Sequence, residues 1–230
     1  MSPTRSGRAP SRGFTLLELL VVVGLISAFS FILINTLGST RGAALQSAQS
    51  TLANLIVAAR TKAASSGQSS RILIQFDATN STAPTRFLRH LVLQVQVNGA
   101  WQSVTDAFLP EGAYVMPGNF SFPAGLLAAT DTSWTKHDGS NLRSTALRNG
   151  NIITESIDGG VVEQWISIPF AAAGTTGAAG DIVIAAGRGR APGSYTSGAA
   201  PVELTHPEQV RGLTLSTYGV ATLINSRTGF

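Results

Sequence analysis

An uncharged stretch near the N-terminus constrains this chain more than any other feature. The 22 residues from Leu19 to Thr40 contain no ionisable side chain. As an α-helix with a rise of about 1.5 Å per residue, this stretch would extend about 33 Å, enough to cross the hydrocarbon core of a bilayer. The sequence therefore predicts a transmembrane helix over residues 14–40.

Transfer energies favour insertion of this helix. Leu16 to Ile34 includes 14 Leu, Ile, Val or Phe residues, which contribute on the order of −4 to −8 kcal/mol at roughly −0.3 to −0.6 kcal/mol each. Glu18 opposes insertion by at most about 3 kcal/mol, and by less near the membrane edge. The apolar side chains therefore outweigh the carboxylate.

The charges that flank the apolar stretch predict its orientation. Arg5, Arg8 and Arg12 precede it, whereas Arg41 alone follows it closely. Positive residues stay on the cytoplasmic side, so we expect a cytoplasmic N-terminus and a domain on the other side of the membrane. Without residues 1–13 the chain keeps 13 basic and 12 acidic residues. The pI of about 10.1 is therefore a property of this leader, which argues against a DNA-coating domain.

Two other interpretations of the apolar stretch stay open, a cleaved secretory signal peptide and a plain signal anchor. A signal peptide has an apolar region of about 7–15 residues that ends in a small-residue cleavage site, whereas this stretch is longer and continues as a helical pattern. A plain anchor leaves Glu18 unexplained, because a carboxylate at that position costs energy and adds nothing to anchoring.

The residues at the start of the apolar stretch form a specific motif. The segment from Ser11 to Leu20, SRGFTLLELL, resembles the cleavage motif of type IV prepilins and type II secretion pseudopilins. In that family prepilin peptidase cuts after the glycine, the new terminal phenylalanine is N-methylated, and the fifth mature residue, a glutamate, serves assembly. The resemblance implies cleavage between Gly13 and Phe14, methylation of Phe14 and an assembly role for Glu18.

Cleavage would give Glu18 a physical reason to be present. The new α-amine of Phe14 is positive, and an unpaired carboxylate is costly in the low dielectric of a helix bundle. The terminal amine of a neighbouring subunit would offset that cost only when the two subunits stand in the correct axial register. We therefore expect Glu18 to act as a register device during assembly.

The helical pattern continues over residues 41–66. Apolar residues recur at three- and four-residue spacing (Leu45, Ala48, Leu52, Leu55, Ile56, Ala59, Ala63), and polar residues are expected on the other faces (Gln46, Gln49, Ser50, Asn54, Thr61). This amphipathic pattern predicts that the second part of the helix packs on a globular domain. Ser65-Ser66-Gly67 predicts its end.

After Gly67 the apolar period changes to two, which predicts β-strands over residues 67–230. The expected strands are residues 71–76, 91–97, 101–104, 164–168, 181–185, 213–216 and 220–224, with turns at Asn98-Gly99 and Tyr218-Gly219. Loops are expected at 118–160 and 171–201. The predicted fold class is α+β, with a long N-terminal helix packed on an antiparallel β-sheet.

The end of the helix carries a second resemblance. Residues 52–63, LANLIVAARTKA, then Gly67-Gln68 and a strand, together with a closing strand–Gly–strand at 215–220, are similar to minor pseudopilins of the general secretion pathway H / FimT type. This implies a pilin-like fold and a minor pilin or pseudopilin whose partners are prepilin peptidase, other pilin or pseudopilin subunits and inner-membrane lipid. The absence of cysteine distinguishes the chain from a typical major pilin.

No catalytic residue, cofactor or metal site is expected, so an anchored enzyme is the least favoured class. The chain has no cysteine, no GxSxG nucleophile elbow and no GK[ST] phosphate loop. His90, His137 and His206 have no partner at ligand spacing, and the segment from Asp131 to Asp138 lacks the oxygen-ligand spacing of an EF-hand loop. Trp101, Trp134 and Trp165 are expected to serve packing.

One basic motif supports an alternative function. Gly187-Arg188-Gly189-Arg190 is expected in an exposed loop, where two arginines can contact phosphates. Some FimT-type minor pilins associated with DNA uptake carry a similar Gly-Arg-x-Arg motif, which implies Arg188 and Arg190 as candidate DNA contacts of a membrane-anchored minor pilin. A solvated loop is the plainer interpretation. The choice among secretion, twitching and competence systems stays open.

Overall fold

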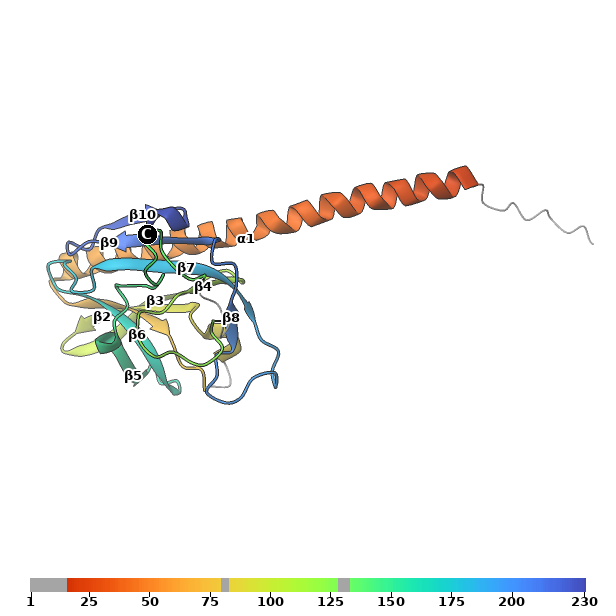
Figure 1. The fold of residues 1–230 in the computed structure, drawn as a ribbon. Helices are drawn as coiled ribbons and strands as arrows, with labels where there is room; N and C mark the ends of the chain where they lie inside the picture. The colour runs from red at the N-terminus through yellow and green to blue at the C-terminus, as the bar shows by residue number, and fades with distance from the viewer. Residues whose placement is uncertain (1–15, 80–82, 128–132) are drawn as a thin grey trace, which may run out of the picture. The chain divides into compact units, whose positions relative to one another are not determined.

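The computed structural model describes residues 16–79, 83–127 and 133–230 (Figure 1). Helix α1 covers Leu16–Ser66. The chain divides into two compact units, residues 1–40 and 41–230, and each is described by itself. In the first unit the described side chains between Leu16 and Ser27 are all exposed.

The second part of α1, residues 41–66, buries the predicted apolar stripe. Its seven expected core residues are all less than 9 % exposed (Leu45, Ala48, Leu52, Leu55, Ile56, Ala59, Ala63). The prediction for Gln49 was wrong, because this side chain is 2 % exposed. Its Nε2 donates to the carbonyl oxygens of Gly212 at 2.6 Å and Ile224 at 2.8 Å. The buried Gln49 amide therefore supplies the donor for one carbonyl within a strand and one at the end of the next strand.

The predicted end of the helix is confirmed at Ser66. Gly67 follows with a φ of +63°, the left-handed conformation that glycine adopts without steric cost after a helix. The Ser66 hydroxyl donates to the carbonyl oxygen of Lys62 at 2.7 Å. The chain then turns into the first strand.

The first sheet, sheet A, has the strand order β3-β2-β1-β6-β5. Its strands are β1 (Ser70–Gln75), β2 (His90–Val97), β3 (Ala100–Phe108), β5 (Ile152–Ser156) and β6 (Val162–Phe170), and the short helix α2 (Ala83–Arg86) precedes β2. The predicted turn between β2 and β3 is confirmed, with φ of +51° at Asn98 and +84° at Gly99. Such paired positive φ angles favour Asn-Gly in tight hairpins.

The second sheet, sheet B, has the strand order β10-β9-β7-β4, and β8 pairs with β7. Its strands are β4 (Ala113–Val115), β7 (Gly180–Gly189), β8 (Val202–Leu204), β9 (Val210–Leu215) and β10 (Ala221–Ile224). Two 3₁₀ turns cover Asn149–Asn151 and Arg227–Gly229. All strand pairs are antiparallel. The predicted α+β class is therefore confirmed, with two sheets in place of the single sheet expected.

Two expected loops contain regular structure. Strand β5 lies within residues 118–160 and pairs with β6, and β7 continues to Gly189 within residues 171–201. The end of β7 alternates glycine with arginine, which hides the apolar period that predicts a strand. A Cβ on Gly187 would lie 2.8 Å from the Tyr114 ring and 3.0 Å from the Glu203 carbonyl oxygen. Glycine therefore lets β4 and β8 approach β7 closely.

The main core lies where the second part of α1 meets the two sheets. Figure 1 shows β9 and β10 alongside this part of the helix, and the Gln49 hydrogen bonds join the same elements. From sheet A the core receives Ile72, Ile74, Leu91, Leu93, Ile166 and Ile168, and from sheet B Ile182, Ile184, Leu213 and Leu215. Burying a side chain of this kind contributes about 1.5–3 kcal/mol. The opposite face of sheet A holds a smaller cluster of Leu73, Val92 and Trp165.

Candidate functional site

The expected processing site lies at the edge of the described chain. Gly13 and Phe14 are outside the described residues. Glu18 belongs to the first turn of α1, and its side chain is also outside the described part. The roles of these three residues therefore stay predictions.

The first part of α1 presents an apolar surface beside this motif. Leu16 is 83 % exposed, Leu20 is 66 % exposed and Val23 is 54 % exposed. Soluble monomers rarely expose contiguous apolar patches of this kind. Among the residues whose placement the structure describes, no helix combines the length and apolarity needed to cross a membrane.

The basic motif lies at the end of β7 rather than wholly in a loop. Arg188 is opposite Glu203 of β8, and its Nη2 lies 2.8 Å from Glu203 Oε2. Its side chain is nevertheless 72 % exposed. Arg190 instead donates from Nη2 to the carbonyl oxygen of Gly125 at 2.6 Å.

The absence of a side chain at Gly125 leaves room for the Arg190 guanidinium. Its φ is +82°, and an added Cβ would lie 2.6 Å from Arg190 Nη1. Arg188 and Arg190 line one cavity of about 340 Å³ with Ser194 and Glu203. The structure thus brings the two arginines together, with one carboxylate beside them.

The isolated polar residues considered from sequence have ordinary partners. His90 Nε2 lies 3.4 Å from Asp106 Oδ2. The carboxylate of Asp138 accepts hydrogen bonds from the Ser140 hydroxyl and backbone N–H, which lower the pKa of Asp138. Asp131 is outside the described residues. Within the described ranges, no three His, Asp or Glu side chains gather as a metal site would require.

The tryptophans serve packing, as predicted. Trp134 and Trp165 are buried at 2 % and 0 % exposure. The Arg71 guanidinium lies over the ring of Trp101, 4.1 Å from its centroid. This stacking is typical of an arginine and an aromatic ring on one sheet face.

A charged cluster on the outer face of sheet A was not predicted from the sequence. Arg86, His90 and Asp106 come from α2, β2 and β3, and they are linked through hydrogen bonds of 3.0–3.4 Å. The available signal was the polar alternation of β2, where Gln94 and Gln96 are an even number of positions from His90 and therefore face the same side of the strand. That alternation predicts an outer face, but not which partners meet there.

Comparison with known proteins gives one family match and several structural likenesses. The family model of the prokaryotic N-terminal methylation motif matches residues 8–34. No curated protein matches the chain. Two structures of the minor pseudopilin EpsH from the type 2 secretion system of Vibrio cholerae are 15 % and 12 % identical. Each covers 79 % of this chain, with 94 % and 92 % of its own chain aligned and a TM-score of 0.37.

The type IV minor pilin FimU of Pseudomonas aeruginosa strain PAO1 is 14 % identical. It covers 78 % of this chain, with 87 % of its own chain aligned and a TM-score of 0.35. Because these TM-scores are low, the functional argument rests on the N-terminal match. Residues 8–34, which include Gly13, Phe14 and Glu18, carry a prokaryotic N-terminal methylation motif.

Proposed function

We propose that this chain is a minor pilin or pseudopilin subunit of a type II secretion pseudopilus or a type IV pilus. The observation that carries the proposal is the methylation motif over residues 8–34. In this role prepilin peptidase cuts after Gly13, and the new α-amine of Phe14 receives a methyl group. The chain has no reaction of its own to perform, and the enzyme in the pathway acts on it.

The exposed apolar part of α1 supports an anchoring role. Residues 14–40 hold the subunit in the bacterial inner membrane, with the N-terminus in the cytoplasm and residues 41–230 on the other side. Leu16, Leu20 and Val23 are exposed on this part of the helix, where they can contact lipid before assembly and neighbouring subunits after it. Burial of these side chains in either environment removes apolar surface from water.

The first experiment tests processing. Intact mass of the full chain extracted from membranes should show loss of residues 1–13 and addition of one methyl group at Phe14. Gly13→Val should retain the leader, because it places a branched side chain at the cleavage site, where the wild-type glycine has no side chain. Gly24→Ala, where an added Cβ meets nothing within 4 Å, is the matched control and should be processed normally. A wild-type chain that keeps residues 1–13 rejects the proposal.

The second experiment tests assembly. Glu18→Ala should be processed and inserted but should not enter filaments, because the neighbouring amine loses its carboxylate partner in the low-dielectric bundle. Ser27→Ala is the matched control, since Ser27 is exposed on the same part of α1 and its hydroxyl bonds only within the helix. Electron microscopy and cross-linking of sheared filaments give the readout. Normal filament entry of Glu18→Ala would show that Glu18 has no register role.

The exposed guanidinium of Arg188 favours a second candidate function, DNA binding by an anchored minor pilin. Fluorescence anisotropy of the full chain in detergent with duplex DNA, at about 50 and 200 mM salt, measures it. Binding should weaken with salt and disappear in the double variant Arg188→Ala/Arg190→Ala. The exposed Arg148 supplies the matched control Arg148→Ala, which should bind as wild type. Absence of salt-sensitive binding by the wild type excludes this candidate.

A further inference from the structure

The outer face of sheet A buries charged side chains that satisfy one another. Arg71, 7 % exposed, donates from Nε to Gln94 Oε1 at 2.8 Å and contacts Glu155 through Nη2. Arg86 Nη1 lies 2.9 Å from Glu163 Oε1, whose side chain is 2 % exposed. A buried charge that keeps its partner avoids the desolvation penalty of an unpaired one. These two arginines and two glutamates are therefore matched within the chain.

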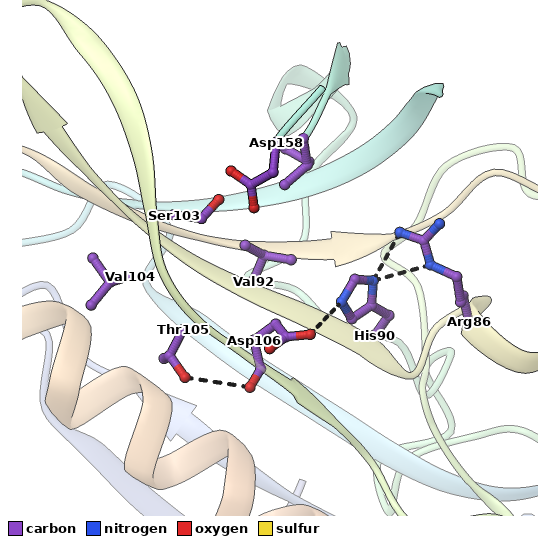
Figure 2. A pocket seen from close by; sticks show the side chains of 9 residues that line it. Arg86, His90, Val92, Ser103, Val104, Thr105, Asp106 and Asp158 are labelled. Carbon is purple, nitrogen blue, oxygen red and sulfur yellow. Dashed lines mark hydrogen bonds and ion pairs between the residues drawn. The ribbon is translucent and has the colours of Figure 1, made fainter. Parts of the chain in front are cut away.

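Beside this matched network lies a cavity of about 370 Å³. Val92 and Ile157 supply apolar walls, Ser103 supplies a hydroxyl, and Asp106 and Asp158 supply carboxylates. Figure 2 shows the two carboxylates with Val92 between them in this view, and His90 between Arg86 and Asp106. The cavity thus combines apolar walls with two acidic groups.

A β-bulge places these groups together. Leu93 of β2 is opposite Thr105, whereas the next residue, Gln94, is opposite Ser103, so Val104 is the extra residue of β3. In a regular strand, residues three positions apart such as Ser103 and Asp106 point to opposite faces, because successive side chains alternate. The bulge turns both residues to the same face, where they line the cavity. Bulges are frequent where a side chain must be re-aimed beside a functional site.

The charge left in the cavity is negative. The Arg86 guanidinium is paired with Glu163. Burial, and next the charge of Arg86, lower the pKa of His90, so His90 is neutral near pH 7. Within the described part of the chain, no lysine or arginine forms an ion pair with Asp106 or Asp158. The cavity therefore matches a cation.

Strand β3, which contributes four of the nine residues that line the cavity, is also an open sheet edge. In the described sheet A, β3 is the terminal strand and pairs with β2 alone. Its nine residues include no proline, lysine or arginine, which protect many edges from pairing, and the bulge at Val104 divides the edge into two regular segments. Val104 and Phe108 are 45 % and 50 % exposed along it. An edge of this kind can accept an extended peptide as an added strand.

We propose that this cavity receives the lysine or arginine side chain of an extended polypeptide segment that pairs with β3. The aliphatic stem lies along Val92 and Ile157, and the cationic end reaches Asp106 and Asp158. Backbone pairing with β3 supplies the orientation, and the two carboxylates select the basic side chain. The site does not depend on residues 1–40 or on the role of the methylation motif.

A labelled peptide series tests the proposal on the full chain in detergent. The probe is the five-residue sequence Thr-Val-Lys-Val-Thr, and its matched control carries norleucine in place of lysine. Fluorescence anisotropy should show saturable binding of the lysine peptide and about tenfold weaker binding of the control. Asp106→Asn/Asp158→Asn should weaken binding of the lysine peptide about tenfold. Glu208→Gln, which changes a carboxylate 64 % exposed outside the cavity, should not.

Peptide methylation separates strand pairing from simple charge attraction. In an added strand, only every second backbone N–H donates to the neighbouring strand. Two versions of the lysine peptide are therefore made, one N-methylated on its odd-numbered amides and one on its even-numbered amides. One should lose binding and the other should keep it. Equal binding of the lysine and norleucine peptides, or full binding by the aspartate variant, overturns the cationic site. Equal binding of both methylated peptides, or n-butylamine matching the peptide, overturns the strand-pairing mode.

A divalent cation is the remaining competitor for two carboxylates. Calorimetry with calcium alone should show no saturable binding that the aspartate variant loses, because the described cavity offers only two carboxylates whereas calcium takes six to eight oxygen ligands. Such binding would assign the cavity to a metal and overturn the proposal. Unchanged circular dichroism of Asp106→Asn/Asp158→Asn shows that lost binding is not lost folding.

Discussion

Two regions of this chain reverse the usual distribution of side chains between surface and interior. The first part of α1 exposes Leu16, Leu20 and Val23, whereas the outer face of sheet A buries Arg71 and Glu163. The buried charges find partners inside the chain, so these side chains are satisfied within one subunit. The exposed apolar side chains are stabilised only when another surface or a membrane covers them. The apolar surface of the first part of α1 therefore needs a covering partner or a membrane.

The largest effect is expected from charging the apolar part of α1. Leu20→Arg/Val23→Arg should raise the free energy of membrane insertion by up to roughly 6 kcal/mol, because each arginine costs about 2.5–3.5 kcal/mol at the centre of a spanning helix and less toward its ends. The variant should leave the membrane pellet after an alkaline carbonate wash. Val57→Arg, at an exposed position of the second part, should stay with the pellet. Retention of the double variant would show that this surface is not an anchor.

A core substitution in the second part of α1 sharpens the comparison. Leu52 is fully buried, whereas Val57 is 58 % exposed on the same helix. Leu52→Ala should lower the free energy of unfolding by about 2–5 kcal/mol, because it removes packed atoms and leaves a cavity. Val57→Ala should change it by less than about 0.5 kcal/mol. Chemical denaturation of the full chain in detergent measures both, and similar costs would remove the distinction between core and surface.

The buried amide of Gln49 should contribute less. Gln49→Leu removes the donor to Gly212 and Ile224 and should lower the free energy of unfolding by about 1–3 kcal/mol, because buried acceptors lose their hydrogen bonds. The exposed Gln46 gives the control Gln46→Leu, expected to be near neutral. Denaturation curves decide the matter, and equal stability of the two variants would contradict a structural role for the Gln49 amide.

The smallest effect is expected from pH. Burial, followed by the Arg86 charge, holds the pKa of His90 below its usual value of 6.5, although the Asp106 carboxylate opposes this. As the pH falls, His90 of the unfolded chain therefore binds a proton at a higher pH than His90 of the folded chain does. The free energy of unfolding should fall as pH drops from 6.5 to the folded pKa and should level off below it.

Denaturation at about pH 7.5 and pH 5.5 tests this sign. His90→Gln should lose less stability on acidification than wild type does. The more exposed His206 provides the control His206→Gln, which should behave as wild type. An unchanged pH dependence in His90→Gln would mean that another group carries the effect.

The sequence predicted elements whose periodicity is strong and local. The stripe from Leu45 to Ala63 repeats at helical spacing and is buried as the pattern predicts. The alternation from Leu91 to Val97 predicted a strand, which is confirmed as β2, although most of β1 and β2 is buried on both faces. Asn98-Gly99 defined a turn because few other residue pairs adopt two positive φ angles. In each case one short segment contains the whole signal.

The sequence failed where a residue's role depends on a distant partner. Gln49 is polar and was assigned to the surface, but its partners are strand carbonyls at Gly212 and Ile224. β8 has three residues and pairs with the glycine-rich end of β7, so neither has a periodicity of its own. The cavity depends on the bulge at Val104, which is defined only by the register between two strands.

Gln49 also has a consequence for the order of events during synthesis. Its two acceptors lie 163 and 175 residues later in the chain, and contacts of such long sequence separation form slowly because a large loop must close first. Helix α1 is synthesised before β9 and β10, so the buried amide of Gln49 gains its hydrogen-bond acceptors only when this last hairpin has formed. A ribosome stalled before β9 would leave the Gln49 amide without its two acceptors and this side of the core uncovered, which exposes the chain to proteolysis.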